Sequence, residues 1–144
     1  TRATGKVLAI MVADCLPVMF TSVAGDIVGV AHAGWKGLAD GVLFSTVTAL
    51  GGNSVLAWMG PAIGPCHYTV GEDVRARFSS GTGFVEGSDK KFSMDLYAIA
   101  KEQLESLGVE TYGGGLCTYC DSSKFFSYRR DGVTGRMGGF IWME

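Results

Sequence analysis

The chain has 144 residues, of which 47% are hydrophobic and 18% charged, and its formal net charge is −2. This composition indicates a single globular domain over residues 1–144 and excludes a disordered chain. The weak, mixed charge and the lack of a long apolar run exclude nucleic acid and membranes as expected partners. The four cysteines are expected to be reduced thiols in a cytoplasmic protein.

In chain order, short apolar runs alternate with glycine-rich turns and two amphipathic segments. Strands are expected at residues 7–13, 17–22, 26–32, 55–59, 109–112, 124–131 and 136–143. Helices are expected at residues 36–50, at 72–78, and from Ser93 or Asp95 to Gly108. Residues 60–71 and 79–91 are expected to be loops. Many strands with two good helices predict a layered domain of mixed α and β structure.

The segment MVADCLPVMF contains Cys15, and VAHAGWKG contains His32. If Ala24-Gly25 is a two-residue hairpin turn, Pro17 lies opposite His32 and Cys15 shares their face. Cys15 and His32 are then diagonal neighbours with Cβ atoms roughly 7 Å apart. At that separation they suit one metal ion or a nucleophile pair. The alternative, a buried thiol beside a structural imidazole, stays open, because a one-residue slip would separate the two side chains.

A catalytic zinc site would need a third protein ligand beside Cys15 and His32. Asp14 is adjacent in sequence, but in a regular strand its side chain points to the other face. Cys66 and His67 lie in the glycine- and proline-rich segment 60–71, which could fold over the pair. They are therefore the local candidates for the third ligand.

The segment CTYC places Cys117 and Cys120 at the spacing of a zinc knuckle. A structural zinc site needs a second pair of ligands, and we expect no such pair in this sequence. A redox CxxC normally precedes a helix, whereas a strand is expected after this segment. The sequence therefore favours two thiols in a packed loop.

Three arginines surround the turn in SYRRDGVTGR: Arg129, Arg130 and Arg136. Together with His67 they are candidates for contacts to a substrate or phosphate, because guanidinium groups bind oxyanions in a bidentate way. The alternative is that they pair with Asp131 and neighbouring acids and fix the turn. The structural role is favoured for most of them.

Several segments, in this order, resemble the bacterial YfiH (DUF152) family: ADCLPV, VAHAGWKG, GPAIGPC, CTYC, FFSYRRD and TGRMGGFIW. Members of this family are called either multicopper polyphenol oxidases (laccases) or purine nucleoside phosphorylases. The resemblance implies an α+β fold, an α/β/β/α layered sandwich with mixed sheets. It also implies a zinc or copper site made by Cys15, His32 and a His upstream of residue 1. The chain is thus expected to lack the N-terminal segment of the family.

The resemblance further implies phosphorolysis of purine nucleosides (adenosine, inosine and methylthioadenosine) together with adenosine deamination. A bound metal with an open position would activate water or phosphate for these reactions. Two alternatives remain: a copper-dependent polyphenol oxidase, and a cell-wall precursor editing factor or inactive fragment. The two histidines of the chain argue against a multicopper centre, which needs many.

Overall fold

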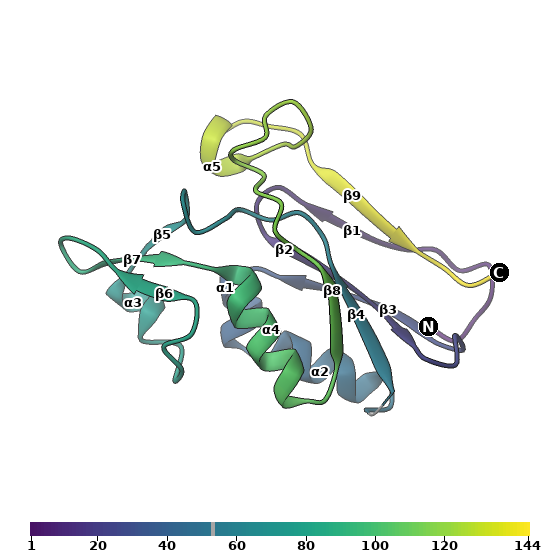
Figure 1. Cartoon of the computed structure of the whole chain (residues 1–144). Helices are drawn as coiled ribbons and strands as arrows, with labels where there is room; N and C mark the ends of the chain where they lie inside the picture. The colour runs from purple at the N-terminus through teal and green to yellow at the C-terminus, as the bar shows by residue number, and fades with distance from the viewer. Residues whose placement is uncertain (53) are drawn as a thin grey trace.

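A four-stranded mixed sheet forms the centre of the computed structural model, which describes residues 1–52 and 54–144 (Figure 1). Its strands, in spatial order, are β3 (Val28–Ala33), β2 (Leu16–Ser22), β4 (Val55–Met59) and β8 (Glu110–Gly113). Strand β2 is antiparallel to both β3 and β4, whereas β4 and β8 are parallel. Pro17 lies opposite His32, so the predicted hairpin register is confirmed.

Three helices cover one face of this sheet: α1 (Trp35–Ala39), α2 (Val42–Ala49) and α4 (Leu96–Ser106) (Figure 1). Between helices and sheet lies a core that contains Leu16, Phe20, Leu43 and Leu104, each at most 1% exposed. The single helix predicted over residues 36–50 is wrong in one respect. It breaks at Gly41, whose φ of 77° is a left-handed conformation that glycine adopts without steric cost.

The start of α4 at Asp95 follows from a side-chain cap. Oδ1 of Asp95 accepts hydrogen bonds from the backbone N–H groups of Tyr97 (2.9 Å) and Ala98 (3.1 Å). These are donors that the helix itself cannot satisfy, so an aspartate here fixes the first turn. The predicted start at Asp95 is thereby confirmed.

Strands from the two ends of the chain form a further layer. Strand β1 (Leu8–Val12) pairs antiparallel with β9 (Met137–Ile141), and the pair lies against β2 and β3 on the side away from α4 (Figure 1). Along β2 the side chains alternate, so Val18 and Phe20 face the helices while Met19 reaches Gly139 of β9. Helices, central sheet and this strand pair make a layered α+β fold, as the resemblance implied.

A small third sheet contains β5 (Thr69–Gly71), β7 (Lys91–Met94) and β6 (Phe84–Glu86), with the short helix α3 (Glu72–Arg75) after β5. The helix confirms the prediction at 72–78, although it is shorter. The loops predicted over 60–71 and 79–91 are both wrong in part: β5 lies within the first, and β6 and the first residue of β7 lie within the second. Glycines on both sides of these short strands hid them from the sequence pattern.

The strand predicted over residues 124–131 is also wrong. The segment is a loop followed by the single-turn helix α5 (Tyr128–Asp131). Oγ of Ser127 accepts a hydrogen bond from the N–H of Arg130 at 3.2 Å, so Ser127 caps this turn. The capping serine outweighs the strand preference of the aromatic residues before it. The strand predicted at 136–143 is confirmed as β9.

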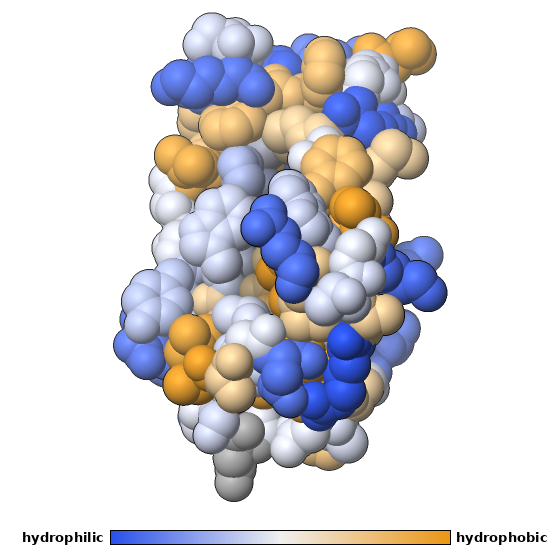
Figure 2. Space-filling view, turned by 90° about the vertical axis from the view of Figure 1, so that its right-hand side faces the viewer, coloured by the Kyte–Doolittle hydropathy of each residue, from blue (hydrophilic) through white to orange (hydrophobic). Residues whose placement is uncertain are grey.

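Part of the surface is apolar. Trp58 of β4 and Tyr112 of β8 are each about half exposed, and with Met19 and Ile141 they line a shallow hollow on the sheet face that the helices leave open. Figure 2 shows hydrophobic residues in patches between charged ones. No helix among the described residues combines the length and hydrophobicity needed to cross a membrane.

Candidate functional site

Cys15 and His32 both lie against Gly34, the residue between β3 and α1. A Cβ added to Gly34 would lie 2.7 Å from Sγ of Cys15 and 3.8 Å from Cδ2 of His32. A side chain at position 34 would therefore displace the sulfur of Cys15, and both Cys15 and His32 lie next to this glycine. Strand β2 begins at Leu16, so Cys15 belongs to the turn before the strand, and the strand alternation used to place its side chain stops one residue short of it. Their joint role as metal ligands stays a prediction.

The turn before Cys15 is held by the side chain of Asp14. Oδ1 accepts a hydrogen bond from Oγ1 of Thr118 at 2.7 Å, and Oδ2 accepts one from the backbone N–H of Arg129 at 2.6 Å. The carbonyl of Asp14 accepts a third from the N–H of Ile63 at 2.9 Å. The carboxylate of Asp14 thus binds one side-chain hydroxyl and one backbone N–H, and its part in the site is to position Cys15.

Tyr68 and Arg129 border the same site. The guanidinium carbon of Arg129 lies 5.1 Å from the centre of the Tyr68 ring, and Nη1 donates to the carbonyl of Thr69 at 3.3 Å. Burial, and next the neighbouring thiol of Cys15, raise the pKa of Tyr68 to about 12. Tyr68 is therefore a neutral hydroxyl near neutral pH. Of the three predicted arginines, Arg129 is the one that lies against Tyr68, which in turn neighbours Cys15.

The electrostatic setting of Cys15 distinguishes between the two chemistries left open by the sequence. Burial raises the pKa of the Cys15 thiol, and the nearby carboxylate of Asp14 raises it further. A reactive nucleophile needs the opposite shift, because the thiolate is the attacking form. A bound cation would hold the sulfur as a thiolate despite its burial. The environment therefore argues against a free nucleophile, and it is compatible with either a metal ligand or a buried neutral thiol.

The other two arginines are committed to the protein. The predicted pairing of an arginine with Asp131 is confirmed for Arg130, which forms an ion pair with that residue at 2.8 Å. Its remaining N–H groups donate to three backbone carbonyls, those of Thr118, Tyr119 and Phe125. Arg136 donates from Nη1 to the carbonyls of Thr134 and Gly135, at 3.0 Å each. Arg130 therefore has no N–H group left for a substrate oxyanion, and Arg136 is tied to its own loop.

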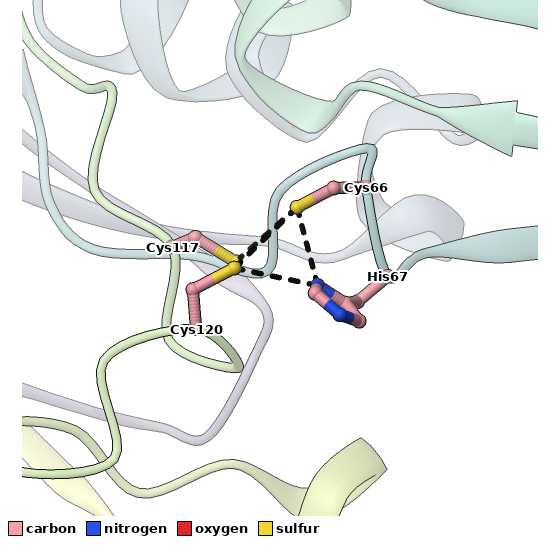
Figure 3. A group of neighbouring side chains, drawn as sticks. All are labelled: Cys66, His67, Cys117 and Cys120. Carbon is pink, nitrogen blue, oxygen red and sulfur yellow. Dashed lines mark hydrogen bonds between the residues drawn. The ribbon is translucent and has the colours of Figure 1, made fainter.

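A second cluster of ligand-type side chains contains Cys66, His67, Cys117 and Cys120 (Figure 3). The three sulfur atoms and Nδ1 of His67 all lie within 4.8 Å of one another. Among the described residues it is the one group of three or more such side chains that could hold a metal ion. The expectation that the sequence holds no second pair of zinc ligands for CTYC is therefore wrong, because Cys66 and His67 lie beside Cys117 and Cys120. They lie here and not over Cys15 and His32.

The path of the chain explains why these four residues meet. Strands β4 and β8 are parallel neighbours, so the segments that leave their carboxyl ends emerge at the same edge of the sheet. The two segments continue side by side through a bridge between Ala62 and Cys117. The N–H of Gly64 then donates to Sγ of Cys117 at 3.2 Å. The cluster could not be predicted without this parallel pairing, because the segments GPCH and CTYC are distant in sequence.

Electrostatics couple the cysteines of this cluster, all of which are free thiols. Burial acts to raise the pKa of Cys117, but N–H donors from Gly64, Cys120 and Tyr119, together with the Cys120 thiol, bring it below its ordinary value. Hydrogen bonds with the sulfurs of Cys117 and Cys66 raise the pKa of Cys120 to about 12. The protein alone thus favours the thiolate at Cys117 over the thiolate at Cys120.

A family model described as "Multi-copper polyphenol oxidoreductase laccase" matches residues 1–144. Among curated relatives, "Purine nucleoside phosphorylase YfiH" of Escherichia coli (strain K12) is 48% identical, over 99% of this chain and 62% of its own length. "Purine nucleoside phosphorylase" of Haemophilus influenzae is 43% identical, over 100% of this chain and 63% of its own length. The chain thus spans about three fifths of the length of these relatives.

Two solved structures share the fold. A Neisseria meningitidis protein described as DUF152 superposes with a TM-score of 0.92 at 44% identity, over 96% of this chain and 60% of that protein. YlmD from Geobacillus stearothermophilus superposes with a TM-score of 0.89 at 36% identity, over 99% of this chain and 58% of its own. These similarities confirm the predicted fold class and the resemblance on which it depended.

Proposed function

Because the chain belongs to the YfiH (DUF152) family, we propose that it serves the phosphorolysis of purine nucleosides at the Cys15–His32 site. The observation that best supports this proposal is that Cys15 and His32 both lie next to Gly34. Arg129 lies against the neighbouring Tyr68. Relatives that are 43–48% identical bear the name purine nucleoside phosphorylase. The proposed substrates are adenosine, inosine or methylthioadenosine together with phosphate. Deamination of adenosine is a proposed second reaction, and the cytoplasm is the proposed location.

The donor atoms suit zinc. Thiolate sulfur and imidazole nitrogen are common zinc ligands, and the glycine at position 34 leaves room for both side chains to converge. Catalytic zinc sites have three protein ligands and an open position. The proposal takes the third ligand, a His, from the part of the relatives' length that this chain does not span. When bound, the metal would supply a Lewis acid that activates water or polarises a phosphate oxygen.

Each side chain at the site then has a distinct task. Cys15 and His32 hold the metal. The guanidinium of Arg129 binds phosphate oxygens and neutralises their charge, while Tyr68 fixes the guanidinium by lying against it. Asp14 is a positioning residue, since it holds the backbone of Arg129 through the 2.6 Å hydrogen bond.

The description of the family as a multicopper oxidase suggests a different reaction, the oxidation of phenols. Multicopper centres use many histidine ligands, and this chain has two, His32 and His67. These two belong to different groups, since His67 faces the cysteine cluster. The phosphorylase is therefore the favoured function. Copper titration would reverse this preference if several copper ions bound per chain.

The first prediction concerns catalysis in a chimera in which these 144 residues replace the matching part of the E. coli relative, so that the whole family length is present. We expect phosphate-dependent release of adenine from adenosine. Cys15→Ala or His32→Ala should lower kcat/KM by more than roughly 100-fold. Losing a residue that only supports a metal ligand costs up to about 100-fold, and losing the ligand itself should cost more. Arg129→Lys should raise the KM for phosphate, because lysine lacks the bidentate fork.

The matched control is Arg77→Lys, which alters an exposed arginine paired with Asp40 on the surface. This variant should keep the activity of the parent. Full activity in the Cys15→Ala chimera would show that the proposed site is wrong. Loss of one zinc ion per chain from the Cys15→Ala protein, relative to the parent chimera and measured by mass spectrometry of bound metals, should accompany the loss of activity.

A further inference from the structure

We propose that Cys66, His67, Cys117 and Cys120 form a structural zinc site, separate from the Cys15–His32 site. All four side chains converge on one point between two loops, residues 60–68 and 113–121 (Figure 3). Four protein ligands leave no open coordination position. Such closed sites stabilise folds and do not activate substrates.

The separations of the ligand atoms match a tetrahedral ion. With Zn–S near 2.3 Å and Zn–N near 2.0 Å, tetrahedral ligand atoms lie roughly 3.5–3.8 Å apart. Sγ of Cys66 lies 3.6 Å from Sγ of Cys120 and 4.0 Å from Sγ of Cys117. Nδ1 of His67 lies 3.2 Å from Sγ of Cys66 and 3.3 Å from Sγ of Cys120. Small shifts of side chains would therefore complete the coordination shell.

The kind of donor selects the metal. Three thiolates and one imidazole are soft or intermediate ligands, which Ca²⁺ and Mg²⁺ do not prefer. Zinc accepts three sulfurs and one nitrogen in tetrahedral geometry without any redox change. The spacing of Cys117 and Cys120 also allows both to bind from one tight turn.

Outer contacts already hold the ligands in place. Sγ of Cys117 accepts a hydrogen bond from the N–H of Gly64, and N–H groups of Tyr119 and Cys120 also point to it. The ring of Tyr119 stacks on His67, with centroids 3.9 Å apart and planes 13° apart. Such surrounding contacts orient ligands and stabilise thiolates at metal sites.

The position of the cluster gives the ion a structural task. Tyr68, directly after His67, packs beside Cys15, and Thr118, directly after Cys117, donates to Asp14. A zinc ion here would join the two loops that support the Cys15 turn from opposite sides. The loops otherwise meet through a few hydrogen bonds and the single bridge of Ala62 with Cys117.

The test uses a Cys15→Ser/His32→Ala double variant, so that only the cluster can retain metal and the proposed activity plays no part. After purification under reducing conditions, metal analysis should find one zinc per chain. Cys66→Ser or Cys120→Ser in this background should weaken zinc affinity by more than roughly 100-fold. With Co²⁺ in place of zinc, the thiolate charge-transfer absorption should fall by about one third in each variant.

Two controls keep the outcome interpretable. His67→Cys should still bind one zinc, because four cysteines also make a complete tetrahedral site, and it tests binding even if a serine variant fails to fold. Circular dichroism of each variant records folding. The proposal is overturned if the double variant binds no zinc, if the serine variants bind it as tightly, or if intact-mass measurements without reductant find a Cys66–Cys120 disulfide in place of the metal.

Discussion

At the scale of single residues, Asp14 joins parts of the chain that are far apart in sequence. Its carboxylate accepts hydrogen bonds from Thr118 and Arg129, and its φ is 91°, a left-handed conformation that few side chains adopt readily. Asn and Asp are the residues besides glycine that tolerate this conformation best. The identity of residue 14 therefore matters both for its oxygens and for its backbone.

Asp14→Ala should lower the free energy of unfolding by about 3 kcal/mol, because two donors lose a charged acceptor and alanine is strained at this φ. Asp14→Asn should cost about 1 kcal/mol, since the amide keeps one acceptor oxygen and tolerates the conformation. Urea unfolding would measure both. In the control Asp40→Ala, loss of an exposed ion pair should cost no more than about 1 kcal/mol. Equal effects at positions 14 and 40 would contradict this role.

Some residues of the site were predictable and others were not. The proximity of Cys15 and His32 follows from the β-hairpin register. The position of the turn fixes which residues lie opposite each other, and the alternation of side chains in a strand fixes the face on which they lie. The cluster of Cys66, His67, Cys117 and Cys120 depends instead on β4 and β8 being parallel neighbours. Parallel pairing leaves no local mark in the sequence, since a long crossover separates the two strands.

At the scale of elements, Tyr97 of α4 connects the helix to both loops that carry the cysteine cluster. Its hydroxyl lies 2.9 Å from the carbonyl of Gly60 and 2.8 Å from that of Leu116, and it accepts a hydrogen bond from the N–H of Ala62 at 2.8 Å. Apolar periodicity predicted the helix and its buried face. It did not predict this hydroxyl, because a single polar atom does not alter the period.

Tyr97→Phe should lower the free energy of unfolding by about 1–3 kcal/mol, because the N–H of Ala62 and a carbonyl lose a buried partner. Amide hydrogen exchange should rise in residues 60–64 and 114–118 more than in β2. Tyr112→Phe is the matched control, since it removes the same atom from an exposed tyrosine whose hydroxyl reaches only Glu110. The control should change stability by less than about 0.5 kcal/mol. A similar loss in both variants would mean that the Tyr97 hydroxyl does not join the loops.

At the scale of the whole molecule, the two ends of the chain close the layered structure together. Strands β1 and β9 pair from Leu8 with Ile141 to Val12 with Met137, and the N–H of Gly5 donates to the carbonyl of Met143 at 2.9 Å. Both strands were predicted from their composition. Their pairing was not, because contacts of such high sequence separation are set by the packing of the layers and not by local pattern.

Gly139 of β9 shows how closely the layers approach, and it allows a test of their packing. A Cβ at this position would overlap the end of the Met19 side chain and lie 3.1 Å from Cγ2 of Ile10. Gly139→Val should therefore displace the end of the Met19 side chain from between the layers and lower the free energy of unfolding by about 1 kcal/mol, despite the strand preference of valine.

Gly138→Val is the control for this prediction, because the side chain of residue 138 points outward, where it meets only the ring of Phe140. That ring is 57% exposed and free to turn away, so the substitution should be neutral or slightly stabilising. Urea unfolding of the two variants would measure the difference. Because they differ only in the face of β9 that carries the new side chain, equal stabilities would show that β9 does not pack against the central sheet.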